Sequence, residues 1–135
     1  WQGSPEGYMG TMVENCPNGF LMFGPNVAVS SSAFIIMEAQ LTYIIDALKQ
    51  AIEQDIQTIE PNPEITKAFN EKVQAALQST VWNQGGCQSY FIDRNGRNST
   101  AWPWTTFKLR EKMKKFNLME YLIDFKPSAK QKDSV

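Results

Sequence analysis

The feature that most constrains the fold of this chain is an apolar repeat between residues 33 and 52. An apolar patch at residues 33–37 passes into large apolar side chains spaced mostly three and four residues apart. These are Met37, Leu41, Ile44, Ile45, Leu48 and Ile52. Such spacing is typical of one face of a helix. We predict a helix that Ser31 or Ser32 caps with its side chain, and whose apolar first turn points inward.

Short apolar runs on either side of this helix predict two strands. Residues 20–23 (FLMF) lie between Asn18-Gly19 and Gly24-Pro25, as in a fully buried strand of a parallel sheet. Residues 55–60 have the composition of a second strand, and the prolines at 61 and 63 end it.

A second helix has clear start signals. Asn62 stands at the N-cap, Pro63 at the first helical position, and Glu64 near the positive end of the helix dipole. We expect this helix to end at residues 84–86. Its predicted core stripe is Ile65, Phe69, Val73, Ala76 and Leu77.

The last third of the chain predicts a hairpin and a basic helix. Residues 89–93 read as a strand that reverses through a type I′ turn at Asn95-Gly96. Thr105 or Thr106 begins a helix to about Phe116, Asn117 begins a capped turn, and residues 126–135 form a disordered polar tail. Alternating strands and helices followed by a hairpin indicate a mixed α+β piece that closes an α/β domain.

Composition narrows the chemistry. The 135 residues include no histidine, so the chain by itself supplies no imidazole base, imidazole metal ligand or Ser-His-Asp triad. Its two cysteines favour a reducing compartment, hence the cytoplasm. The longest uncharged stretch, residues 15–37, is broken by prolines and glycines, and we predict no transmembrane segment.

Charge is unevenly distributed along the chain. Residues 1–93 carry three basic and ten acidic side chains, and residues 94–135 carry ten basic and four acidic ones. Five basic residues gather at 108–115. Such a face indicates either a solvated helix surface or contact with an acidic partner. No nucleic-acid-binding motif accompanies it.

Several ordered blocks resemble the C-terminal region of flavin-containing monooxygenases of the Baeyer–Villiger type. The first are residues 16–26 (CPNGFLMFGPN) and 34–44 (FIIMEAQLTYI). Residues 81–91 (VWNQGGCQSYF), 93–103 and 116–121 (FNLMEY) follow in the same order. The resemblance spans roughly residues 9–125. Members usually have a Gly-rich loop where this chain has residues 27–32 (VAVSSS).

The resemblance implies that residues 1–125 are the closing part of an FAD-binding, Rossmann-like domain of an NADPH-dependent enzyme. Such an enzyme inserts one oxygen atom from O2 into a ketone through a peroxyflavin. The residues implied on the flavin side are Gly24, Pro25, Asn26, Ser32, Ala33 and Phe34. Trp82 and Tyr90 are implied near the nicotinamide nucleotide, and no catalytic residue is assigned.

The chain contains neither of the family's GxGxxG turns and begins with Trp1. We therefore expect the last piece of a longer enzyme, which alone is inactive and holds neither FAD nor NADP. Three alternatives stay open. The chain is a non-catalytic interaction or dimerisation module that uses the 108–115 face, the enzyme oxidises nitrogen or sulfur instead of ketones, or Trp82 and Tyr90 are buried core residues.

Overall fold

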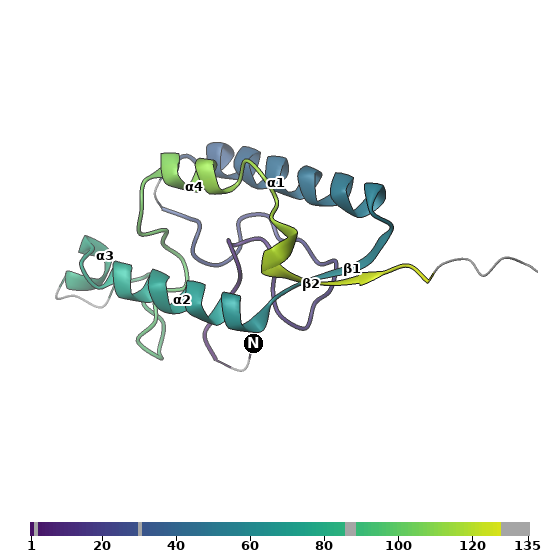
Figure 1. Ribbon diagram of the computed structural model, residues 1–135. Helices are drawn as coiled ribbons and strands as arrows, with labels where there is room; N and C mark the ends of the chain where they lie inside the picture. Colours follow the sequence, from purple (N-terminus) through teal and green to yellow (C-terminus); the bar gives the residue numbers. More distant parts are fainter. Residues whose placement is uncertain (2, 30, 86–88, 128–135) are drawn as a thin grey trace, which may run out of the picture.

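A computed structural model of the chain describes residues 1, 3–29, 31–85 and 89–127. Two long helices lie on opposite sides of the N-terminal segment, which winds between them (Figure 1). In chain order the elements are α1 (Ala33–Glu53), β1 (Ile56–Pro61), α2 (Pro63–Leu77), α3 (Val81–Gln84), α4 (Thr106–Lys112), the 3₁₀ helix η1 (Leu118–Glu120) and β2 (Tyr121–Phe125). The predicted mixture of helix and strand is confirmed.

The only sheet in the described part of the chain has two antiparallel strands, β1 and β2. Ile56 lies opposite Phe125 and Pro61 lies opposite Tyr121. The sequence predicted β1 to within one residue at each end. It did not predict β2 at all. The sequence of β2 lacks the alternation of apolar and polar residues that indicates a half-buried strand, and the strand buries only its first residue, Tyr121.

α1 is the helix predicted from the apolar repeat, and it begins directly after Ser32. The capping prediction is only partly right, because the Ser32 carbonyl accepts from the Ile35 and Ile36 amides while its side chain makes no capping hydrogen bond. In the first turn Ile36 is fully buried, but Phe34 and Ile35 are exposed. The inward-pointing first turn was therefore wrong for two of its residues.

Most of the apolar repeat that predicted α1 does not pack inward. Leu41, Ile45, Leu48 and Ile52 are all exposed. The buried residues are Ile36, Ala39, Gln40, Tyr43 and Ala47. α1 thus carries two apolar faces. The face with two small alanines packs on the core, because alanine lets the helix approach closely.

The strand predicted at residues 20–23 does not form. Phe23 has φ 58°, which is outside the strand region, and Met22 and Phe23 are exposed. The Leu21 and Gly24 amides instead donate to the carbonyls of Thr11 and Gly10. This segment therefore packs as a loop on the turn at residues 8–12, with no strand beside it in the described part.

Aromatic side chains form the centre of the core. Tyr43 of α1 and Tyr121 of β2 are buried, with their hydroxyl oxygens 2.7 Å apart. The Phe116 ring stacks on Tyr121 at 4.2 Å between centroids, and Tyr8 meets both Tyr121 and Phe69 edge to face. Burial raises the pKa of Tyr8, Tyr43 and Tyr121 well above the ordinary value of 10.0.

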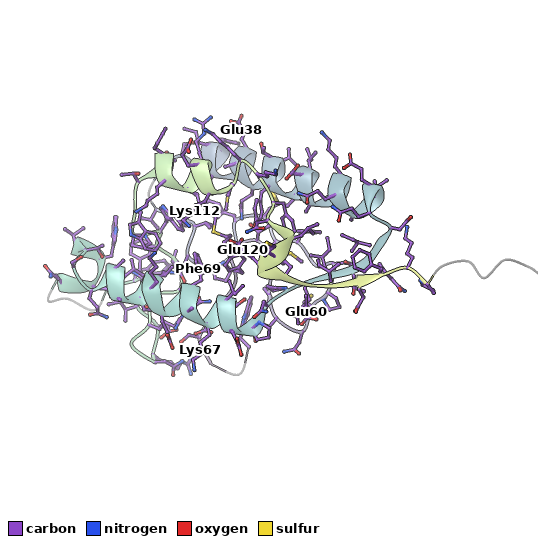
Figure 2. The ribbon with its side chains drawn as sticks, viewed as in Figure 1. Glu38, Glu60, Lys67, Phe69, Lys112 and Glu120 are labelled. Carbon is purple, nitrogen blue, oxygen red and sulfur yellow. The ribbon has the colours of Figure 1, made fainter. Side chains whose placement is uncertain are left out.

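α2 begins as predicted. The Asn62 side chain accepts from the Glu64 amide at 2.9 Å, and Pro63 is the first helical residue. Figure 2 shows Phe69 on the inner side of α2 and Lys67 on the outer side. The predicted end at residues 84–86 was wrong. α2 ends at Leu77, where the Thr80 hydroxyl donates to the Leu77 carbonyl, and the short helix α3 follows.

The chain reverses near residue 95, but not in the predicted hairpin. Ser89–Asp93 is not a strand, and only the bridge between Ile92 and Asn98 links the two arms. Gly96 has φ 75° while Asn95 is not left-handed, so the turn is not type I′. The Asp93 carboxylate accepts from the Asn95 and Arg97 amides. The nearby Ser4 side chain, followed by the Arg97 backbone amide, lowers the pKa of Asp93.

The C-terminal caps follow the sequence closely. Thr105 accepts from the Lys108 amide at the start of α4, and Asn117 accepts from the Met119 amide at the start of η1. α4 ends at Lys112, four residues before the predicted end, and Met113 and Phe116 then turn into the core. Lys126 and Pro127 are exposed. The rest of the predicted tail, residues 128–135, lies outside the described residues.

Candidate functional site

The candidate site lies where the loop before α1 meets residues 98–102. The Asn26 amide donates to the Ser99 carbonyl at 2.9 Å, and the Ala28 amide donates to the Thr100 carbonyl at 3.0 Å. The Trp102 amide returns a hydrogen bond to the Ala28 carbonyl at 3.0 Å. Residues more than seventy positions apart are thus joined backbone to backbone, which fixes the path of the loop.

The Asn26 side chain strengthens this junction. Its amide nitrogen donates to the carbonyls of Asn98, at 2.8 Å, and Ala101, at 3.0 Å. Asn26 is 1% exposed and has φ 57°, a left-handed conformation that asparagine adopts more readily than most residues. Most of its hydrogen-bonding capacity is therefore used within the chain.

Asn98 connects the junction to two helices. Its side-chain oxygen accepts from the amides of Thr100 and Ala101, and its side-chain nitrogen donates to the Asn83 side chain in α3. Its backbone carbonyl also accepts from Gln74 of α2 at 2.8 Å. Asn98 itself is fully buried, and its hydrogen bond from the Ala101 amide is buried as well.

Gln40 of α1 holds the other side of the loop. This fully buried side chain donates to the Gly10 carbonyl at 2.8 Å and accepts from the Phe23 amide at 2.7 Å. Neither Gln40 nor Asn98 was predicted as a site residue. The only sequence signal is a polar side chain on the buried face of a helix, and the hydropathy pattern does not reveal which of α1's faces is buried.

Gly24 packs directly against the turn at Gly10. Its amide donates to the Gly10 carbonyl at 3.1 Å, and a Cβ on Gly24 would lie 2.4 Å from that oxygen. Any side chain at residue 24 would therefore force the two segments apart. The glycine is explained by packing within the chain. Its implied place beside flavin stays a prediction.

A cavity of about 300 Å³ opens beside the junction. It is lined by Trp1, Pro5, Phe23, Gly24, Pro25, Ala28, Ser99 and Thr100. Two buried oxygens at the junction, Asn26 Oδ1 and Ser99 Oγ, have no hydrogen-bond partner among the described residues. A buried polar atom without a partner is costly, so both atoms fit a site that a polar ligand completes.

The structure divides the predicted flavin-side residues into two groups. Gly24 and Pro25 line the cavity, and Asn26 stands beside them at the junction. Ser32, Ala33 and Phe34 lie instead at the N-terminus of α1 and are not among the lining residues described for that cavity. Phe34 is 75% exposed. A helix of 21 residues presents partial positive charge at this end.

The predicted nicotinamide-side residues lie together around Phe91. Trp82 meets Phe91 edge to face at 5.3 Å between centroids, and Tyr90 meets it at 5.7 Å. Trp82 is partly buried and packs on a small cluster that contains Val73 and Leu77. Tyr90 is 96% exposed, so the alternative that it is a buried core residue was wrong. Cys87 lies outside the described residues.

The basic face at 108–115 is a solvated surface in the structure. All five basic side chains are exposed, while Leu109 and Met113 between them are buried. Lys108 lies over the Trp104 ring at 5.6 Å, and Lys114 forms an ion pair with Glu111. Contact with an acidic partner stays a prediction.

Comparison with known proteins shows what this chain is similar to. No family model matches the chain. A Baeyer–Villiger monooxygenase of Streptomyces coelicolor is 37% identical over 125 residues, which cover 91% of this chain and 24% of the relative. A Baeyer–Villiger monooxygenase of Pseudomonas aeruginosa is 33% identical over 131 residues, 96% of this chain and 25% of the relative.

Solved structures agree on the fold. Cyclohexanone monooxygenase from Rhodococcus sp. Phi1 bound to NADP⁺ superposes with a TM-score of 0.77 at 20% identity, over 93% of this chain and 24% of that one. An oxidised steroid monooxygenase bound to NADP gives a TM-score of 0.79 at 19% identity, over 93% of this chain and 24% of that one.

The fold is thus that of a segment of a flavin monooxygenase. Within that class, the chain is related to the Baeyer–Villiger monooxygenases, as its sequence blocks predicted. It spans about a quarter of the length of the curated relatives it matches. No helix in the described part is both long and apolar enough to cross a membrane.

Proposed function

We propose that this chain is part of an FAD- and NADPH-dependent monooxygenase that inserts one oxygen atom from O2 into a ketone. The observation that carries the proposal is the 37% identity to a Baeyer–Villiger monooxygenase over 91% of the chain. A relative from Aspergillus niger, 31% identical over 135 residues, is named an FAD-binding monooxygenase. Two of the solved structures with the same fold contain NADP.

The residues proposed to hold FAD are Gly24, Pro25 and Asn26 together with Ser32, Ala33 and Phe34 at the start of α1. The nearby cavity and the unpartnered oxygens of Asn26 and Ser99 support this assignment. When bound, FAD supplies the redox and oxygen chemistry, and the protein contributes orientation and electrostatics. The positive end of α1 favours the negative charge of reduced flavin. This division of roles suits a chain without histidine.

Tyr90 and Trp82 are proposed on the nicotinamide side. The Tyr90 ring is open to solvent and free to stack on a planar ligand, while Trp82 is held by Phe91 and the cluster under it. The remainder of the enzyme, as the partner that supplies the dinucleotide-binding turns, completes both sites. We place the enzyme in the cytoplasm, and the exposed free thiol of Cys16 fits a reducing compartment.

A chimera tests the proposal. This chain replaces the matching segment of the Streptomyces coelicolor relative, and the purified protein is measured for bound flavin and for NADPH oxidation with and without a cyclic ketone. We expect flavin to be retained and a lactone to form from the ketone. The isolated 135-residue chain, the matched control, should show no flavin absorbance and no activity.

Three results would count against parts of this proposal. Flavin bound by the isolated chain would show that it needs no partner to hold FAD. A folded, flavin-loaded chimera that oxidises an amine or a sulfide but no ketone would favour the N- or S-oxidising alternative. A folded chimera that loses flavin, beside a parent enzyme that keeps it, would contradict the proposed flavin-side role.

A further inference from the structure

α1 carries a second apolar face that nothing in the described part of the chain covers. Its members, which we name the outer stripe, are Phe34, Leu41, Ile45, Leu48 and Ile52. Their exposed fractions are 75%, 51%, 43%, 47% and 77%. The spacing of seven, four, three and four residues places them along one line of the helix. At 1.5 Å per residue the outer stripe is roughly 27 Å long.

The opposite face of α1 is already occupied. Ile36, Tyr43 and Ala47 are buried in the core of this chain, about half a turn around the helix from the outer stripe. A helix that is apolar on two opposite faces is typical of the interior of a larger protein. A single exposed leucine needs no explanation, whereas a continuous apolar line does.

Charged side chains border the outer stripe. Glu38 and Lys49 are exposed on α1, and Figure 2 shows Glu38 on the outer side of the helix. An apolar centre with a polar border is the usual composition of a protein interface. The outer stripe therefore has the chemistry of a surface that packs against another polypeptide.

We propose that the occupant of the outer stripe is the remainder of the monooxygenase polypeptide, either joined to this chain or supplied separately. This inference rests on the proposed function. The relatives are about four times as long as the part matched here, so each contains some three quarters of its length outside this segment. The same helix begins at the proposed flavin side, so docking along its length would also fix the direction of its N-terminus.

Thiol labelling of Leu48→Cys tests the occupant. The labelling rate is followed by mass spectrometry on the peptide that contains residue 48, in the isolated chain and in the chimera described above. We expect labelling to be at least about tenfold slower in the chimera, because the side chain becomes buried. Lys72→Cys, on the exposed side of α2, is the matched control and should label equally fast in both proteins.

The outcomes separate the two proposals. Equal labelling of residue 48 in both proteins would overturn the outer stripe as a docking surface, even if the chimera makes lactone. Slow labelling of residue 48 in a chimera that makes no lactone would support the outer stripe as a docking surface and contradict the proposed reaction. Labelling of the isolated chain that slows as its own concentration rises would assign the outer stripe to a second copy and overturn the proposal.

A two-piece mixture provides a second measurement if the chimera does not fold. The remainder of the relative, made separately, is titrated with the full 135-residue chain and binding is followed by sedimentation. Leu48→Asp should weaken binding by about tenfold or more, because it places a charge in an apolar contact. Lys72→Glu should leave binding unchanged. A folded remainder that does not bind the unaltered chain would overturn the proposal.

Discussion

The two proposed cofactor regions are held in different ways. The loop at residues 24–28 is buried from Pro25 on and is fixed by hydrogen bonds to other parts of the chain. The Asn26 side chain donates to the carbonyls of Asn98 and Ala101, and Gln40 of α1 accepts from the amide of Phe23 just before the loop. The region of Trp82 and Tyr90 is held by ring contacts to Phe91, and Tyr90 is almost fully exposed. The first region is therefore shaped by this chain alone. The second has room for a partner or ligand to order it.

The largest effect is expected from Asn98→Ala. The change leaves the Thr100 and Ala101 amides and the Asn83 side chain without their partner in a buried place, and should lower the free energy of unfolding by about 3 kcal/mol. Urea denaturation of the isolated chain measures it. Asn95→Ala, at the exposed turn nearby, is the control and should cost less than about 0.5 kcal/mol. Equal losses for the two variants would contradict the network as the support of the loop.

Gly24→Ala should come next, with a loss of about 2 kcal/mol. The new Cβ would meet the Gly10 carbonyl oxygen at 2.4 Å, and Gln40 holds both that carbonyl and the neighbouring Phe23 amide in place. Thermal unfolding followed by circular dichroism measures the change. Gly3→Ala makes a matched control, because a Cβ there would have no neighbour within 4 Å. A Gly24→Ala variant as stable as the control would show that the loop yields easily.

Tyr43→Phe should cost about 1 kcal/mol, because it leaves the buried Tyr121 hydroxyl without its partner. The same pair predicts a pH dependence. The pKa values of Tyr43 and Tyr121 in the folded protein lie above the ordinary value of 10.0. Their contribution to the free energy of unfolding is therefore complete below about pH 10 and is lost as the pH rises further. Urea midpoints between pH 8 and about pH 11 measure it. Tyr90→Phe, at an exposed ring, is the control and should leave the midpoint at pH 8 unchanged.

What the sequence predicts well is local. The caps at Asn62, Thr105 and Asn117 bond to amides two or three residues away, so their signal lies within a few letters of sequence. Gln40 and Asn26 bond to residues 17 to 75 positions away, and no local pattern encodes those partners. The loop at residues 24–28 was therefore singled out from the sequence, while the residues that hold it were missed. Its place on the flavin side stays a prediction.

The choice of the buried face of α1 has the same origin. The apolar repeat predicts that a helix forms. Which of its two apolar faces is buried depends on where this chain supplies side chains to pack against the helix. The strand predicted at residues 20–23 likewise depends on a neighbouring strand, which the described part of this chain does not provide. Both outcomes depend on packing partners rather than on local propensities.

The smallest effect on stability, and the sharpest test of the second region, is expected from Tyr90→Ala. The ring is 96% exposed, so the free energy of unfolding should stay within about 0.5 kcal/mol of the unaltered chain. In the chimera, loss of a stacking ring worth about 1 kcal/mol should raise the KM for NADPH by about fivefold and leave kcat unchanged. Met119→Ala, an equally open apolar residue on η1, is the control for surface effects. An unchanged KM would remove Tyr90 from the nicotinamide side. A loss of stability would instead mean that Tyr90 is packed like the first region, which would end the contrast between the two.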